Sequence, residues 1–235
     1  MAKYSLGRRP SFDERDKGFL MSRKLPPAGT VLPTRKTWAI SGTNLDQLNT
    51  GTCVGMAWAN FLRCAPIRSN AGVDENYAFK IYDIAIATDE WTDNDSDTAR
   101  QFGTSVRAGA EATLQLGRLK SYLWAFELQP AVEWVLMQGP VVLGVDWYQS
   151  FFSPNSEGII SIKTNDSIVG GHAILWRGAD TKRALAKLSN SWGDSWGISG
   201  ECYIPFRDLE RLIHDAGEAC TAVESRLKST LPEQS

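Results

Sequence analysis

The spacing of the apolar residues changes part-way along this 235-residue chain, near residue 140. Before that point, apolar residues recur three or four positions apart, which is typical of helices with one buried face. After it, short apolar or alternating runs are bounded by Gly, Asn and Asp, which is typical of strands. A chain whose helices precede its strands favours an α+β fold with separate helical and β-rich regions.

The period and the flanking residues place the individual elements. Helices are predicted over about 53–64, 74–88, 105–116 and 130–138, with Thr52 and Ser105 as N-caps. Strands are predicted over 141–147, 172–178, 184–190 and 201–205, followed by a helical segment near 206–214. The division is therefore a proline-rich, extended arm (1–44), a mainly helical lobe (45–139) and a mainly β lobe with a C-terminal helical segment (140–235).

Composition excludes several classes of partner. The 25 basic and 27 acidic side chains give a net charge of −2, so the chain lacks the basic surface expected of a nucleic-acid or anionic-membrane binder. Its apolar runs are too short for a membrane-spanning helix, and the N-terminus lacks the apolar segment of a secretory signal. We therefore expect no nucleic-acid partner, no membrane partner and a cytoplasmic location.

Cysteine and histidine are scarce, which limits metal chemistry. The four cysteines stand at 53, 64, 202 and 220, and the two histidines at 172 and 214. No zinc-type spacing occurs, and the acidic stretch 89–97 lacks the Gly and distal Glu of a calcium loop, so it is interpreted as a solvated loop. We expect no metal and no cofactor.

Four short segments together suggest nucleophilic chemistry: Gln47 to Cys53, Gly170 to Ala173, Asn190 to Gly193 and Trp196 to Gly200. Cys53 stands at a predicted helix N-terminus, where the helix dipole lowers a thiol pKa. A nucleophilic thiol also needs a base, and the base needs an orienting partner. His172 opens a predicted strand, and Asn190 ends the next one, so the two side chains are expected to lie side by side.

These segments resemble the motifs of the papain-like cysteine peptidases. As in that family, Gln47 precedes Cys53 by six residues, and a Gly-Gly-His segment and an Asn-Ser-Trp-Gly segment follow. His172 and Asn190 come 119 and 137 residues after Cys53, at or slightly below the family spans of roughly 130–150. The resemblance covers about 44–205, is most specific over 190–205, and is closest in style to prokaryotic and bacteriophage members.

The resemblance implies a role for each matching residue. Cys53 would be the nucleophile and His172 the general base and then acid, while Asn190 would orient the imidazole. The side-chain amide of Gln47 and the backbone N–H of Cys53 would form the oxyanion hole. Trp192 would shield the His–Asn pair from water, although it is also interpreted as a core aromatic residue.

Other positions concern the cleft and departures from the family pattern. Gly103 and Gly171 are expected to line the substrate-binding cleft. Thr50 replaces the family's disulfide cysteine three residues before the nucleophile, and Val54 replaces the aromatic residue after it. We therefore expect all four cysteines to be free thiols.

The sequence thus predicts a papain-like, two-lobed α+β fold, with a helical lobe, a β-rich barrel-like lobe and a cleft between them. The predicted activity is that of a cysteine peptidase acting on peptide or protein substrates. One alternative is a catalytically silent papain-fold binding or structural protein, which leaves open association with a virion or a phage protein. Another is a thiol amidase or transferase that uses the same residues. Substrate preference and the role of residues 1–44 stay open.

Overall fold

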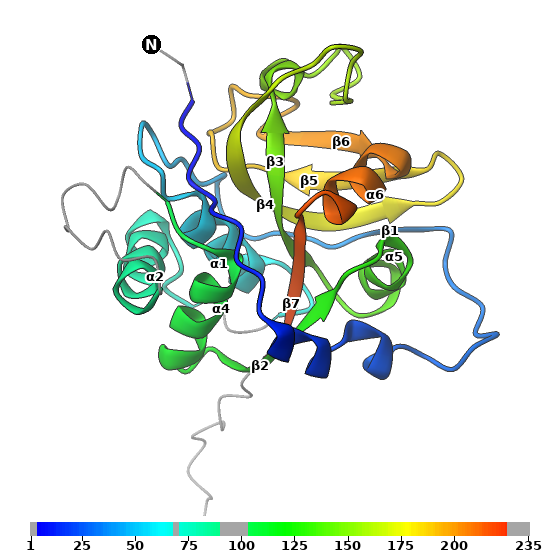
Figure 1. The fold of residues 1–235 in the computed structure, drawn as a ribbon, viewed down its shortest axis with the longest axis horizontal. Helices are drawn as coiled ribbons and strands as arrows, with labels where there is room; N and C mark the ends of the chain where they lie inside the picture. Colours follow the sequence, from blue (N-terminus) through cyan, green and yellow to red (C-terminus); the bar gives the residue numbers. More distant parts are fainter. Residues whose placement is uncertain (1–3, 68–70, 90–102, 225–235) are drawn as a thin grey trace, which may run out of the picture.

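The computed structural model describes residues 4–67, 71–89 and 103–224, which form two groups of helices around an antiparallel sheet (Figure 1). The α-helices are α1 (Cys53–Arg63), α2 (Glu75–Thr88), α4 (Val106–Gln115), α5 (Leu128–Met137) and α6 (Phe206–His214). The strands are β1 (Arg35–Thr37), β2 (Leu119–Ala125), β3 (Val141–Tyr148), β4 (Ile168–Asp180), β5 (Leu185–Ser189), β6 (Glu201–Pro205) and β7 (Glu218–Glu224). Most of the acidic loop predicted over 89–97 lies outside the described residues.

The sheet runs in the order β2-β7-β3-β4-β5-β6, and the short β1 pairs with β4. No pairing between β2 and β6 closes it within the part of the chain described here, so the β-rich lobe is an open sheet and not a complete barrel. The predicted strands correspond to β3, β4, β5 and β6, whereas β2 and β7 were not predicted. Because β2 comes from the segment 45–139, the helical part of the chain also supplies a strand to the sheet.

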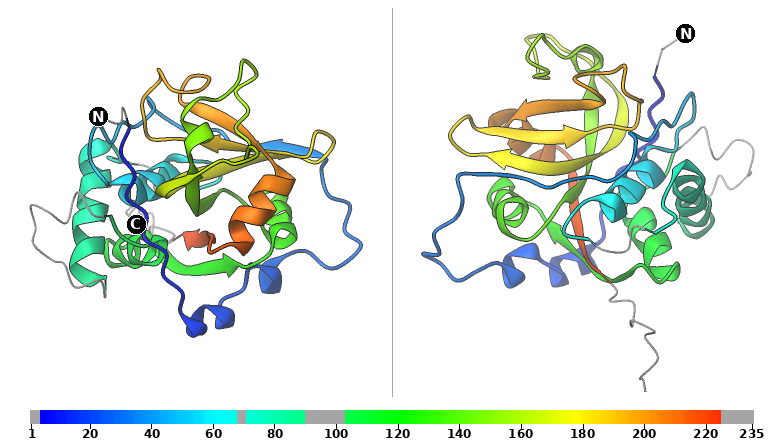
Figure 2. Two further views of the ribbon diagram at one scale, coloured as in Figure 1. Left: turned by 45° about the horizontal axis from the view of Figure 1, so that its top comes forward. Right: turned by 180° about the vertical axis from the view of Figure 1, so that it is seen from behind.

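Helices cover both faces of the sheet, as the views in Figures 1 and 2 show. Helices α1, α2 and α4 pack together on one side, where α1 contacts β3 and β4. Helices α5 and α6 pack against the sheet on the other side. The central strands are therefore buried on both faces, which explains their nearly continuous apolar sequence.

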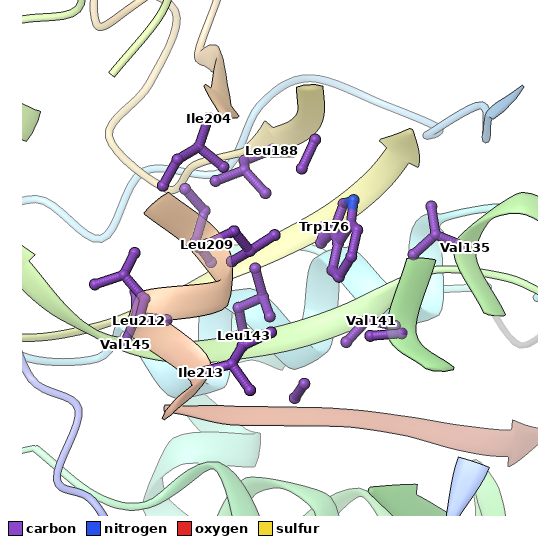
Figure 3. Close-up of a cluster of buried hydrophobic side chains, with 14 of the residues drawn as sticks. Val135, Val141, Leu143, Val145, Trp176, Leu188, Ile204, Leu209, Leu212 and Ile213 are labelled. Atoms are coloured by element: carbon purple, nitrogen blue, oxygen red, sulfur yellow. The ribbon is translucent and has the colours of Figure 1, made fainter. Parts of the chain in front are cut away.

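Alternating residues of β3 divide the core into two clusters. Val141, Leu143 and Val145 belong to one cluster, in which Leu143 and Val145 lie by the apolar side chains of α6 and Val141 lies by Val135 of α5 (Figure 3). The intervening positions face the helical lobe, and that cluster includes Val142 of β3, Ala173 and Leu175 of β4, and much of α1. This period of two fixes which residues of the central strands face α1.

Within the described residues, no helix is both long and apolar enough to cross a membrane. All four cysteines are buried free thiols.

Close packing of α1 against α2 depends on Gly55. A Cβ at this position would lie 2.3 Å from the Ala78 carbonyl oxygen and 2.8 Å from Cβ of Tyr82. We expect Gly55→Ala to lower the free energy of unfolding by about 1–3 kcal/mol, because overpacking outweighs the better helix propensity of alanine. Urea denaturation measures the change. Gly18→Ala, at a site with open space around it, is the control, and equal stability of the two variants would contradict this packing argument.

Candidate active site

Cys53 is the first residue of α1, is fully buried, and lies directly against the sheet. The backbone N–H of Ala173 on β4 donates to its sulfur at 3.4 Å. Thr52 occupies the N-cap position, as predicted, but makes no capping hydrogen bond to the helix. Its hydroxyl instead contacts Oγ1 of Thr50 at 2.7 Å, so the expected side-chain cap is wrong.

His172 and Asn190 form a buried pair on adjacent strands. His172 precedes Ala173 on β4, and Asn190 follows the last residue of β5. Nε2 of His172 lies 2.7 Å from Oδ1 of Asn190, and the same Oδ1 accepts the backbone N–H of Ser191 at 2.8 Å. Since that atom is an acceptor, Nε2 must carry the proton, and a neutral imidazole then has its lone pair on Nδ1. Nδ1 is buried without a hydrogen-bond partner, which leaves it available as a base.

Aromatic rings enclose the imidazole. Trp192, the predicted shield, has its ring centroid 4.6 Å from that of His172. Trp147 on β3 lies at 4.7 Å in an edge-to-face arrangement. Trp147 was not singled out from the sequence, although its place in the predicted strand 141–147 was the available signal. Both rings keep water from the imidazole and its asparagine partner.

Gln47 is fully buried, and all of its amide hydrogens are used. Its Oε1 accepts from the hydroxyl of Ser191 at 2.7 Å. Its Nε2 donates to the carbonyl of Thr50 at 2.7 Å and to the carbonyl of Ser5 at 3.0 Å. Two carbonyl acceptors fix the orientation of this amide. Ser5 therefore places a peptide carbonyl on the donor that the resemblance assigns to the oxyanion hole.

The N-terminal segment, residues 4–9, runs between the helical lobe and the sheet (Figure 1, dark blue). On the sheet side, the N–H groups of Gly7 and Arg8 donate to the Gly171 carbonyl at 3.1 and 2.9 Å. On the helical side, Thr104 donates to Gly7 and accepts from Arg9, each at 2.9 Å. The segment thus joins both sides of the site by peptide hydrogen bonds, in the manner of an added strand.

The two glycines predicted to line the cleft both lie against this segment. A Cβ on Gly103 would come within 2.0 Å of the Gly7 carbonyl oxygen, and one on Gly171 within 2.2 Å of that of Arg8. Gly103 also has φ of +82°, which favours glycine. Only residues without a side chain allow a peptide to approach this closely.

Two side chains anchor the segment. The Tyr4 ring stacks on Trp192 at a centroid distance of 4.6 Å. The Arg8 side chain is fully buried and pairs with Glu218 on β7 at 2.8 Å. Neither anchor was found from the sequence, because residues 4–9 carry no periodic pattern and their partners are distant in the chain.

Burial under the segment controls the ionisation of the site. It raises the pKa of Cys53 to about 11, although N–H groups of Ala173, Gly7 and Val54 favour the thiolate. Burial also lowers the pKa of His172 to about 4, against the effect of Asn190. The predicted low thiol pKa is therefore wrong for this closed arrangement, which holds a neutral thiol and a neutral imidazole near pH 7.

The described residues contain no group of three or more His, Cys, Asp or Glu side chains that could hold a metal ion. The chemistry available at the site is that of a thiol, an imidazole and amide donors.

A family profile described as papain family cysteine protease matches residues 37–220, which include every one of Gln47, Cys53, His172 and Asn190. The chain belongs to the papain family of cysteine proteases. The resemblance to papain-like cysteine peptidases that the sequence motifs indicated is thereby confirmed.

Similar proteins come from bacteria, insects and viruses. Xylellain, a cysteine protease from Xylella fastidiosa, matches with a TM-score of 0.70 and 18% identity, over 94% of this chain and 97% of its own. Digestive procathepsin L2 proteinase from Tenebrio molitor larval midgut matches with a TM-score of 0.66 and 17% identity, over 94% and 78%. These two likenesses establish the papain-like α+β fold.

A viral relative adds a short sequence match. It is an uncharacterized peptidase C1-like protein of Acanthamoeba polyphaga mimivirus, 31% identical over 71 residues. The match spans 29% of this chain and 23% of the viral protein.

Because residues 4–9 cover Cys53, we expect its thiol to be alkylated slowly until this segment leaves. Arg8→Glu would place two carboxylates together at Glu218, and breaking a buried ion pair in this way costs about 3–5 kcal/mol. We expect iodoacetamide to label Cys53 at least about 100-fold faster at pH 6 in this variant than in the parent chain. Peptide mapping after timed labelling measures the rate.

Lys24→Glu, at an exposed position further along the arm, is the matched charge reversal and should leave the rate unchanged. Fast labelling of Cys53 in the parent chain would show that the segment does not protect the thiol.

Proposed function

We propose that this papain-family chain is a cysteine peptidase that hydrolyses peptide bonds through Cys53, His172 and Asn190, with Gln47 in the oxyanion hole. The observation that carries the proposal is the junction of α1 with β4 and β5. It holds the Cys53 sulfur against the N–H of Ala173. Ala173 directly follows His172, whose Nε2 is paired with Asn190 and whose Nδ1 has no hydrogen-bond partner.

The roles follow from which atoms are free. Nδ1 of His172 would take the thiol proton as the Cys53 sulfur attacks the peptide carbonyl. The amide of Gln47 and the N–H of Cys53 would stabilise the oxyanion that forms. His172 would then return the proton to the leaving amine, and a water molecule activated by the same imidazole would hydrolyse the acyl-enzyme.

Residues 4–9 must leave before a substrate can bind. Their backbone uses the peptide-binding groups Thr104 and Gly171, and the Ser5 carbonyl takes a hydrogen from Gln47. When the arm leaves, water would reach Cys53 and His172, and the desolvation that raises the pKa of Cys53 would be lost. The dipole of α1 and the imidazolium of His172 would then favour the thiolate.

The silent-scaffold alternative is less well supported, because a protein without activity has no need to keep all four of these side chains in hydrogen-bonded positions. The cytoplasmic location, the lack of nucleic-acid or membrane partners and a phage-type partner rest on the sequence alone and stay predictions.

Cleavage of a peptide library tests the proposal directly. We expect the Arg8→Glu chain to cleave library peptides and the Arg8→Glu, Cys53→Ala chain to leave them intact, because the alanine removes the proposed nucleophile. Mass spectrometry of the products measures the cleavage. If the Arg8→Glu chain labels rapidly with iodoacetamide yet cleaves no peptide or protein, the peptidase proposal is wrong, and the silent scaffold and the thiol amidase or transferase are the alternatives that replace it.

Gln47→Ala separates oxyanion stabilisation from binding. Loss of one oxyanion donor typically lowers kcat by about 10²–10³, with little change in KM, because the donor acts mainly on the intermediate. Steady-state kinetics on a cleaved peptide, in the Arg8→Glu background, measure both constants. Gln47→Glu is a second variant of similar size that lacks the donor. A kcat within a few-fold of that of the Arg8→Glu chain would show that Gln47 does not stabilise the oxyanion.

A further inference from the structure

The turn that carries Gln47 is closed by Thr50. The N–H of Thr50 donates to the Gln47 carbonyl at 3.2 Å, and the Thr50 hydroxyl donates to the same oxygen at 2.5 Å. The carbonyl of Thr50 in turn accepts from Nε2 of Gln47 at 2.7 Å. The backbone and the side chain of Gln47 are therefore both bonded to this one residue.

The same turn contains a residue in a disfavoured conformation. Leu48 has φ of +54°, in the left-handed region that few residues other than glycine adopt. Its side chain is 65% exposed, so burial does little to hold it there. The N–H of Leu48 donates to Oδ1 of Asp46 at 2.8 Å. Such a conformation persists only where surrounding contacts hold it, and here these contacts come from Asp46 and Thr50.

A second hydroxyl joins this turn to helix α1. Oγ1 of Thr52 lies 2.7 Å from Oγ1 of Thr50. A carbonyl oxygen can only accept, so the single proton of the Thr50 hydroxyl goes to Gln47, and Thr50 must accept from Thr52. The hydroxyl protons thus point from Thr52 through Thr50 to Gln47. This contact uses the Thr52 hydroxyl, which explains why a fully buried N-cap threonine makes no capping bond to α1.

The hydroxyl chain connects the two proposed oxyanion donors. One donor is the amide of Gln47, and the other is the N–H of Cys53, which directly follows Thr52. Such donors are effective where their positions are set before the charge develops. In the closed arrangement, the carbonyls of Ser5 and Thr50 both accept from the Gln47 amide. Departure of Ser5 would free that donor for a substrate oxygen and leave the amide held by Thr50.

We infer, on the basis of the proposed peptidase function, that Thr50 and Thr52 are positioning residues for the oxyanion hole. Their hydroxyls fix the Gln47 amide relative to the N–H of Cys53, and they act through these two donors. The requirement at position 50 is a hydroxyl. Serine can therefore replace threonine there, whereas valine, which has the shape of threonine and no hydroxyl, cannot.

Steady-state kinetics test the Thr50 hydroxyl in the full chain carrying Arg8→Glu. Thr50→Val should lower kcat at least about 5-fold with KM within about 2-fold, because it loosens a donor that acts on the intermediate. Thr50→Ser should keep kcat within about 2-fold of the Arg8→Glu chain, since the hydroxyl is restored.

Thr221→Val is the matched control. It also removes a buried hydroxyl that donates to a carbonyl, that of Pro140 at 2.9 Å, and it should leave kcat unchanged. A kcat for Thr50→Val within about 2-fold of the Arg8→Glu chain would overturn the inference.

Two combinations show whether the hydroxyls act through Gln47. Thr52→Val should lower kcat to a similar extent, and its addition to Thr50→Val should lower kcat by less than about 2-fold more, because either change interrupts the same chain. In a Gln47→Ala chain, Thr50→Val should change kcat by less than about 2-fold, because the donor that it positions is absent. Additive losses in either combination would contradict the proposed positioning.

Alkylation separates positioning of the oxyanion hole from damage to the start of α1. The reaction of Cys53 with iodoacetamide forms no oxyanion, so Thr50→Val should change its rate by less than about 2-fold in the Arg8→Glu chain. An equal fall in alkylation and in kcat would show that the hydroxyl only supports the helix, and the inference would be wrong.

Hydrogen exchange of the Gln47 side-chain amide tests the positioning without turnover. NMR of the Arg8→Glu chain with isotopically labelled glutamine follows the exchange, and Gln47→Ala identifies the signal. Thr50→Val should raise the exchange rate at least about 5-fold, whereas Thr50→Ser and Thr221→Val should not.

The exchange result separates this inference from the proposed function. If the Arg8→Glu chain cleaves no substrate but exchange at Gln47 rises only in Thr50→Val, the positioning stands and the peptidase proposal falls. Unchanged exchange in Thr50→Val overturns the positioning, whether or not substrates are cleaved.

Discussion

The contact between the N–H of Ala173 and the sulfur of Cys53 is where the two halves of the molecule meet. Helix α1 brings the thiol, β4 brings His172, and the chain leaving β5 brings Asn190. None of these elements is adjacent to α1 in the sequence, so the site exists only while α1 packs across the central strands. Packing on both faces of β3 and β4 holds this junction in place.

Burial gives the closed site its chemistry. The segment 4–9 excludes water, and the pKa shifts of Cys53 and His172 follow from that exclusion because desolvation disfavours both charged forms. The same segment carries one charge into the interior, and that charge is placed on a carboxylate at Glu218. The arm therefore keeps the Cys53 thiol neutral and supplies the positive charge that compensates the buried carboxylate of Glu218. Departure of the arm would change both states together.

The sequence revealed the local patterns and missed the non-local ones. Helix α1 and strands β3 to β6 follow from apolar period and flanking residues, and the motif residues near Cys53 and His172 were found because each motif is short. Strand β7 was missed because two Glu and two Ala make up more than half of it, and both residue types are depleted in strands. Strand β2 was missed because Lys120 interrupts its apolar pattern. The course of the arm depends on partners 42 to 210 residues away, and no pattern within residues 4–9 indicates them.

The buried ion pair between Arg8 and Glu218 shows why the contacts of the arm are harder to predict than the catalytic residues. Catalytic residues recur in fixed motifs, whereas the position of Glu218 arises from the register that sets Gly144 opposite it, and neither residue belongs to a motif. Burial raises the pKa of Glu218 to about 7 even with Arg8 opposing that shift, so the carboxylate depends on a neighbouring cation for its charge. Release of the arm would therefore take the cation away from Glu218 and the cover away from Cys53 in the same step, so the ion pair and the closed state of the site depend on each other.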